Sequence, residues 1–115
     1  MKKLLYSPDA IKKLHDIKQE ISARYGSEKA DAVIREMTKE FRGLQQFENK
    51  GPSVENLIGI PCDYRILYVQ HNYAFYRIEE NAVRITDIFH EREDFMWKLF
   101  GVKTTTQETE DYWGE

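Results

Sequence analysis

The chain has 115 residues and a mass of 13.7 kDa, which leaves room for one domain with one hydrophobic core. Apolar residues make up 41% and aromatic residues 13%, which excludes a wholly disordered chain, and the single cysteine, Cys62, excludes an internal disulfide or a cysteine-rich zinc site. The formal charge of −3 neither supports nor excludes a nucleic-acid target, because the placement of the arginines decides that question. No apolar stretch approaches the roughly 20 residues needed to cross a bilayer, so we expect a cytoplasmic protein with no membrane partner.

The N-terminal half of the sequence predicts a strand followed by two helices. Residues 2–6 are a short run that stops at Ser7, Pro8 and Asp9, a typical helix start. Apolar residues then recur every three or four positions at Ile11, Leu14, Ile17, Ile21 and Tyr25. Gly26 ends this helix, and a second apolar face follows at Ala30, Val33, Ile34, Met37, Phe41 and Leu44. Two amphipathic helices joined so closely are expected to fold back as a hairpin.

The second half changes from helical to strand periodicity. Residues 49–53, Gly59 and Pro61 indicate a loop. Residues 64–70, 73–78 and 82–89 are rich in Tyr, Phe, Val and Ile, and the short gaps between them suit tight turns. We therefore expect a three-stranded antiparallel meander, with residues 2–6 joining it as an outer strand. The predicted fold is α+β in the order β-α-α-β-β-β, with the helical hairpin covering one face of the sheet.

The C-terminal part divides into a closing segment and an acidic tail. Residues 95–100 are mostly apolar and predict a short helix or extended segment that closes the domain, which we place at residues 1–103. Residues 1–103 carry all 17 Lys and Arg and 16 of the 20 Asp and Glu, whereas residues 104–115 carry four acidic residues and no base. We expect the tail to be a flexible acidic extension.

Three local phrases, in this order and spacing, resemble the RelE/ParE superfamily of bacterial toxins. They are residues 6–10 (YSPDA), residues 63–68 (DYRILY) and residues 85–94 (ITDIFHERED). The resemblance covers about residues 1–100. It implies a toxin neutralised by a co-encoded antitoxin, which folds a partly disordered segment onto the toxin. Within the superfamily, RelE-like members cut mRNA on the ribosome, whereas ParE-like members act on DNA gyrase without a known hydrolytic step.

The resemblance also suggests candidate site residues. In RelE-like toxins, arginines and lysines on the sheet stabilise the phosphate, and a residue near the C-terminus handles a proton. Carried over by position, Arg65 and Arg92 match such arginines and His90 stands where many relatives have histidine. The tyrosine that relatives carry slightly later is not clearly present, since Phe95 and Trp97 stand there. No metal or other cofactor is expected for this chemistry.

Strand register supplies a second argument about the basic residues. Closing the hairpin around residues 79–82 places Arg77 opposite Arg84, and a modest shift in the preceding turn puts Arg65 beside Arg77. Like charges directly opposite each other are destabilising, so such a row indicates a negatively charged partner. We therefore expect Arg77, Arg84 and Lys98 to bind phosphate or a partner. The alternative reading is that each arginine pairs with an acidic residue of its own domain.

These observations predict the toxin of a type II toxin–antitoxin pair. RelE-like, ribosome-dependent and metal-independent cleavage of mRNA is the expected action, with Arg65, His90 and Arg92 as catalytic residues. Two alternatives remain open: inhibition of DNA gyrase without hydrolysis, and a degenerate member that only binds its antitoxin. The antitoxin is expected to lie across the helical hairpin and toward the sheet.

Overall fold

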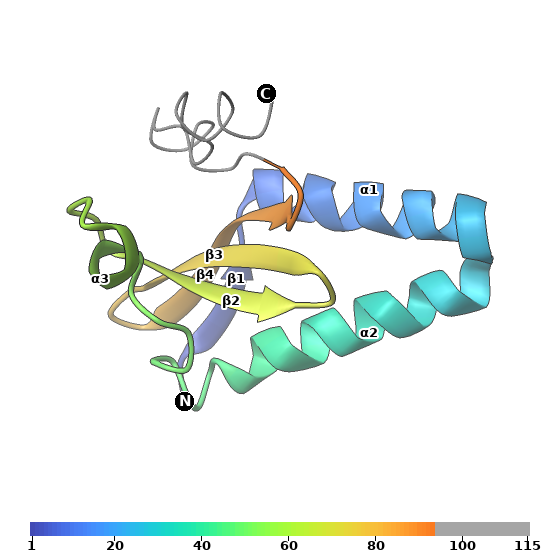
Figure 1. Ribbon diagram of the computed structural model, residues 1–115. Coiled ribbons are helices and arrows are strands. Elements are labelled where there is room, and N and C mark those ends of the chain that lie inside the picture. Colours follow the sequence, from blue (N-terminus) through green and yellow to red (C-terminus); the bar gives the residue numbers. More distant parts are fainter. Residues whose placement is uncertain (94–115) are drawn as a thin grey trace, which may run out of the picture.

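Four strands form one mixed sheet in the order β1-β4-β3-β2, and two long helices pack on one of its faces (Figure 1). The computed structural model describes residues 1–93, so Lys98, the closing segment and the acidic tail lie outside the described residues. The elements in chain order are β1 (Lys3–Tyr6), α1 (Pro8–Tyr25), α2 (Ser27–Gly43), α3 (Val54–Ile58), β2 (Tyr64–Val69), β3 (Asn72–Ile78) and β4 (Ala82–His90). The α+β class and the β-α-α-β-β-β order are confirmed, with β1 as an outer strand that runs parallel to β4.

The start of α1 is fixed by Ser7, as its sequence indicates. The Ser7 hydroxyl oxygen accepts a hydrogen bond from the Ala10 N–H at 3.0 Å, which caps the helix. The same hydroxyl donates to the Thr86 carbonyl of β4 at 2.6 Å. One side chain therefore both caps α1 and ties its first turn to the sheet, along which α1 packs.

The segment between α2 and β2 differs from the expected loop, because α3 forms within it. Ser53 caps this short helix by accepting from the Asn56 N–H, and Gly59 ends it in the left-handed region with φ of 75°. Leu57 and Ile58 are exposed on it, while Val54 is buried against the sheet. The capping residue and the glycine were visible in the sequence, but one turn of helix carries too little periodicity to be recognised.

The strand registers set which side chains share a face. The β2–β3 turn consists of Gln70 and His71, which both have positive φ angles of 48° and 64°, and Val69 pairs with Asn72. The expected turn at residues 71–72 was therefore one residue too late. Between β3 and β4 a bulge shifts the register, since Tyr76 pairs with Ile85 but Phe75 pairs with Asp87. Thr86 is the extra residue, and its hydroxyl donates to the Phe75 carbonyl at 3.0 Å.

Both faces of the sheet carry apolar clusters. The helix-facing cluster joins buried residues of both helices to the sheet; its largest members are Tyr76, Phe41, Met37, Leu44, Ile85 and Ile88. A smaller cluster on the other face contains Val54, Ile66, Phe75 and Phe89. Among residues 1–93 no helix is both long and apolar enough to cross a membrane.

The loop that follows α2 is held to the sheet by a buried hydroxyl and a close glycine. The Tyr76 hydroxyl donates to the Glu48 carbonyl at 2.7 Å and accepts from the Gly51 N–H at 2.9 Å. A Cβ atom on Gly51 would lie 2.3 Å from the backbone oxygen of Ile66 and 3.0 Å from the Tyr76 ring. Only glycine lets the loop come this close to β2.

We predict that Gly51→Ala lowers the free energy of unfolding by roughly 1–3 kcal/mol, because the loop must move away from β2. The measurement is urea unfolding followed by circular dichroism. Gly43→Ala is the matched control, since a Cβ atom there meets nothing within 4 Å and alanine favours a helix. Equal unfolding midpoints for the two variants would show that the close approach at Gly51 does not matter.

Candidate functional site

Arg77 and Arg84 lie directly opposite each other on β3 and β4, as the register argument predicted. They share the sheet face that is turned away from α1 and α2. Each is engaged by a carboxylate of its own domain. Arg77 donates from Nε and Nη2 to Asp63 Oδ2 at 3.2 and 2.9 Å. Arg84 forms a two-pronged pair with Glu79 at 2.8 and 3.3 Å.

These pairs change the titration of the groups involved. The hydrogen bond from Arg84 lowers the pKa of Glu79, and the same bond raises the pKa of Arg84. The hydrogen bond to Asp63 likewise raises the pKa of Arg77. The positive charges of Arg77 and Arg84, which were expected to bind an external anion, are therefore largely balanced by carboxylates within the domain.

Arg65 does not join this row, so the expectation of three arginines side by side was wrong. Arg65 pairs with Tyr76, and Tyr64 is the residue that stands opposite Arg77. The Arg65 side chain donates to the carbonyl oxygens of Gly51 at 2.7 Å and Asn49 at 3.3 Å. A two-residue turn at either 71–72 or 70–71 leaves Arg65 and Arg77 on opposite faces, so the additional one-residue shift assumed for this turn does not occur. Arg65 therefore supports the loop after α2.

His90 and Arg92 lie together at the end of β4, at the opposite end of that strand from Arg84. At about 3.3 Å per residue, roughly 20 Å of strand separates Arg84 from His90. The His90 N–H donates to Glu93 Oε2 at 2.8 Å, and His90 Nδ1 accepts from the Arg92 N–H at 3.1 Å. These hydrogen bonds form the turn that ends β4. The five expected site residues within residues 1–93 are thus not assembled in one place, and Lys98 lies beyond the described part.

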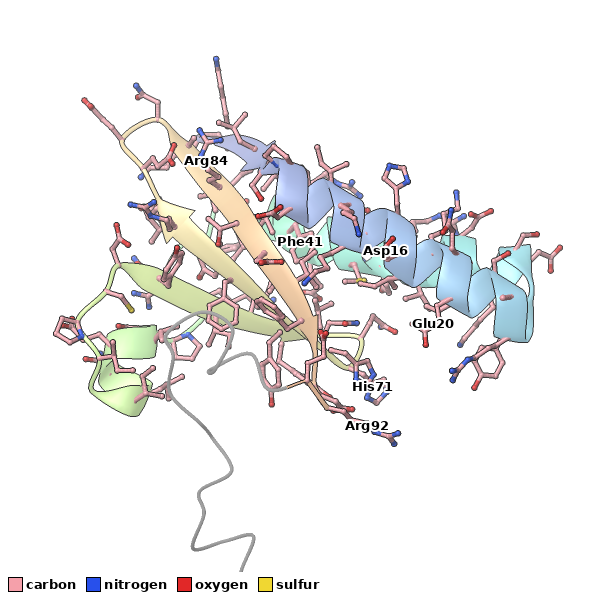
Figure 2. The ribbon with its side chains drawn as sticks, turned by 90° about the horizontal axis from the view of Figure 1, so that it is seen from above. Asp16, Glu20, Phe41, His71, Arg84 and Arg92 are labelled. Atoms are coloured by element: carbon pink, nitrogen blue, oxygen red, sulfur yellow. The ribbon has the colours of Figure 1, made fainter. Side chains whose placement is uncertain are left out.

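A cluster that the sequence did not reveal lies beside Arg92 and is made by Tyr68, His71 and Glu91. The Tyr68 hydroxyl donates to Glu91 Oε1 at 2.7 Å, and His71 Nδ1 lies 3.0 Å from Glu91 Oε2. Because an ionised carboxylate only accepts, His71 Nδ1 carries the proton in this contact. Figure 2 shows His71 and Arg92 at the same end of the molecule. No local motif marks the cluster, since 23 positions separate Tyr68 from Glu91 and only the strand register joins them.

The cluster holds Glu91 in its ionised form. The hydrogen bond from Tyr68 lowers the pKa of Glu91, with a smaller contribution from His71. The same bond raises the pKa of Tyr68. The stabilisation from this cluster is therefore present above the ordinary pKa of a glutamate and is lost as the pH falls through the lowered pKa of Glu91 in the folded state.

The geometry of the cluster suits binding better than phosphate cleavage. Cleavage of RNA needs a base at the attacking oxygen and an acid at the leaving oxygen, on opposite sides of the phosphorus. Glu91 and His71 are instead in direct contact at 3.0 Å, which leaves no room for a phosphate between them. Among the described residues, no group of three or more His, Cys, Asp or Glu is placed to hold a metal ion.

An open hollow of about 580 Å³ lies elsewhere, at the N-terminal edge of the sheet. Its lining is Met1, Lys2, Lys3, Gln45, Gln46, Glu48 and Asn81. Glu48 Oε2, which has no hydrogen-bond partner of good geometry, lies 2.8 Å from Lys2 Nζ in an ion pair. Lys2 and Glu48 are thus paired with each other, and none of the expected site residues lines this hollow.

Comparisons with known proteins agree with this architecture. The family model described as the ParE toxin of the type II toxin–antitoxin system parDE matches residues 4–95. A solved structure titled as the chromosomal ParDE toxin–antitoxin system from P. aeruginosa superposes with a TM-score of 0.67. It is 23% identical to this chain and covers 78% of this chain and 96% of its own, a likeness that shows the fold. No curated protein sequence matches significantly.

We predict that Tyr68→Phe raises the pKa of Glu91, because it removes the hydrogen bond that lowers this pKa most. The shift is measured by NMR titration of the Glu91 side-chain carboxyl carbon. Tyr25→Phe is the control, since Tyr25 is exposed at the far end of α1. A Glu91 titration that is identical in wild type and Tyr68→Phe would contradict the cluster.

Proposed function

Because the chain belongs to the ParE family of type II toxins, we propose that it is a growth inhibitor neutralised by a cognate antitoxin, and that it acts by binding a protein target. This proposal favours inhibition of a protein target without hydrolysis over ribosome-dependent cleavage of mRNA. The fold alone does not choose between them, since both occur on the same scaffold. The choice between binding a protein and cleaving mRNA depends on whether the candidate side chains are already bound within the domain.

One observation carries the proposal: three of the four arginines expected to bind phosphate or a partner, Arg65, Arg77 and Arg84, are used within the domain. Arg77 and Arg84 are neutralised by Asp63 and Glu79, and Arg65 is bound to backbone carbonyls on the helix side of the sheet. A ribonuclease site needs such cations to converge on one phosphate. His90, the expected proton carrier, already accepts from a backbone N–H through Nδ1.

DNA gyrase is the target that we propose. The basis is the resemblance to ParE-like members of the superfamily, which act on gyrase without a known hydrolytic step. A toxin of this kind needs an exposed surface that complements the target and needs no catalytic group. The described residues offer such a surface at the end of the sheet, where Tyr68, His71 and Arg92 are exposed.

The antitoxin is proposed to cover the helical hairpin formed by α1 and α2. The hairpin projects well beyond the sheet, so the inner sides of both helices are only partly covered there (Figure 1). Ile17, Ile21 and Ile34 are half-buried, and Ile11 and Tyr25 are exposed. An amphipathic segment can bury these side chains and compete sterically with the target.

We predict that the purified chain stops supercoiling of relaxed plasmid by purified DNA gyrase, and that the product of the neighbouring open reading frame restores it. Primer extension on messages from induced cells is expected to show no new 5′ ends, because the described residues do not assemble a cleavage site.

Three outcomes would contradict this proposal in whole or in part. New 5′ ends together with undisturbed supercoiling would favour the ribonuclease action, and growth that continues normally on induction would favour a degenerate member. Full supercoiling without new 5′ ends in cells that nevertheless stop growing would keep the toxin and remove gyrase as its target.

A further inference from the structure

One cation among the expected site residues is not used within the domain. The Arg92 guanidinium makes no hydrogen bond or ion pair with any residue in the range 1–93; only its backbone N–H is engaged, by His90. Figure 2 shows this side chain extending from the end of the sheet into the surroundings. Its position contrasts with those of Arg77 and Arg84, which are bound to carboxylates.

The surface around Arg92 is held in one arrangement by Glu91. This carboxylate binds the Tyr68 hydroxyl and the His71 ring, and the Glu91 N–H donates to the His71 carbonyl at 2.9 Å. The turn that carries His71 has two non-glycine residues with positive φ, a conformation that costs roughly 1–2 kcal/mol per residue. Such a turn persists where its surroundings impose it, and strained turns of this kind gather at functional sites.

Two donors at this end of the sheet are available to a partner, the Arg92 guanidinium and His90 Nε2. Both oxygens of Glu91 are engaged, and Glu93 Oε2 accepts from the His90 N–H. Because His90 Nδ1 accepts a hydrogen bond, the neutral ring carries its proton on Nε2. Beside these donors lies the Tyr68 ring, which is 51% exposed and packs on Tyr73 at 5.1 Å between ring centroids.

We propose that Arg92, presented beside the Tyr68–His71–Glu91 cluster, is the group through which this toxin binds a carboxylate on the surface of its protein target. The inference rests on the proposed function and specifies its contact surface. The guanidinium forms a two-pronged pair with the carboxylate, and an apolar or aromatic side chain next to that carboxylate packs on Tyr68. Arg and Tyr in a prearranged setting are the residue types that dominate binding at protein interfaces.

The neighbours of Arg92 favour a carboxylate over a nucleic-acid backbone. Glu91 and Glu93 flank Arg92 in sequence, and Glu91 is held ionised. A chain of phosphates laid across this surface meets both negative charges, whereas a single carboxylate bound at the tip of a long arginine does not. A protein partner with an isolated acidic residue therefore fits the surface better than RNA.

The test compares full-length Arg92→Ala, Arg92→Lys and wild type in cells and with purified gyrase. Arg92→Ala is expected to raise the concentration that half-inhibits supercoiling about thirtyfold, the loss typical of a residue that dominates an interface. Growth arrest is expected to disappear with it. Arg92→Lys keeps the charge but not the planar fork, and is expected to fall between the two. Lys3→Ala at the exposed start of β1 is the control, because Lys3 lies outside both the hairpin and the surface around Arg92, and this variant should arrest growth as wild type does.

Binding to the product of the neighbouring open reading frame and the thermal unfolding midpoint show that each variant is folded. Unchanged growth arrest by Arg92→Ala overturns the inference, as does a loss of antitoxin binding that parallels the loss of toxicity. Because growth arrest is measured without assuming a target, the inference can hold even if gyrase is not inhibited. If the wild type creates new 5′ ends in mRNA and Arg92→Ala does not, the partner is RNA and the inference is wrong.

Discussion

The charge distribution of this protein depends on two guanidinium groups that strand pairing places directly opposite each other. Arg77 and Arg84 repel each other across β3 and β4. Ion pairs within the domain offset this repulsion, because Arg77 binds Asp63 and Arg84 binds Glu79. Asp63 directly precedes β2, and Glu79 directly follows β3. The arrangement converts an apparent anion site into two local ion pairs, so residues 1–93 do not bring free cations together on the outer face of the sheet as phosphate chemistry requires.

Much of the fold could be predicted because its signals are local. The Ser7 cap, the two helical apolar faces and the change to strand periodicity each predict one element, and the order of elements then fixes an α+β sandwich. The β4 bulge also left a trace, since the spacing of Val83, Ile85 and Ile88 breaks the strand period by one residue. The short helix α3 and the exact position of the β2–β3 turn were missed.

The site was harder to predict, because it depends on pairings across the sheet. The two-residue turn at Gln70 and His71 pairs Tyr64 with Arg77, and Arg65 lies on the helix side because the further one-residue register shift that the prediction assumed does not occur. The same turn carried His71 to Glu91, in a conformation that usually calls for Asn or Gly rather than Gln and His. Arg92 was selected from the sequence as a phosphate ligand, yet its setting among engaged carboxylates gives it a different proposed role.

We propose that Arg77 and Arg84 are structural residues and that toxicity depends on a surface at the other end of β4. Growth arrest by the double variant Arg77→Gln/Arg84→Gln therefore tests this proposal most directly. Growth arrest is expected to equal that of the wild type. Loss of growth arrest in a double variant that still folds and still binds the antitoxin would show that the guanidinium pair acts on the target, which would contradict the proposal.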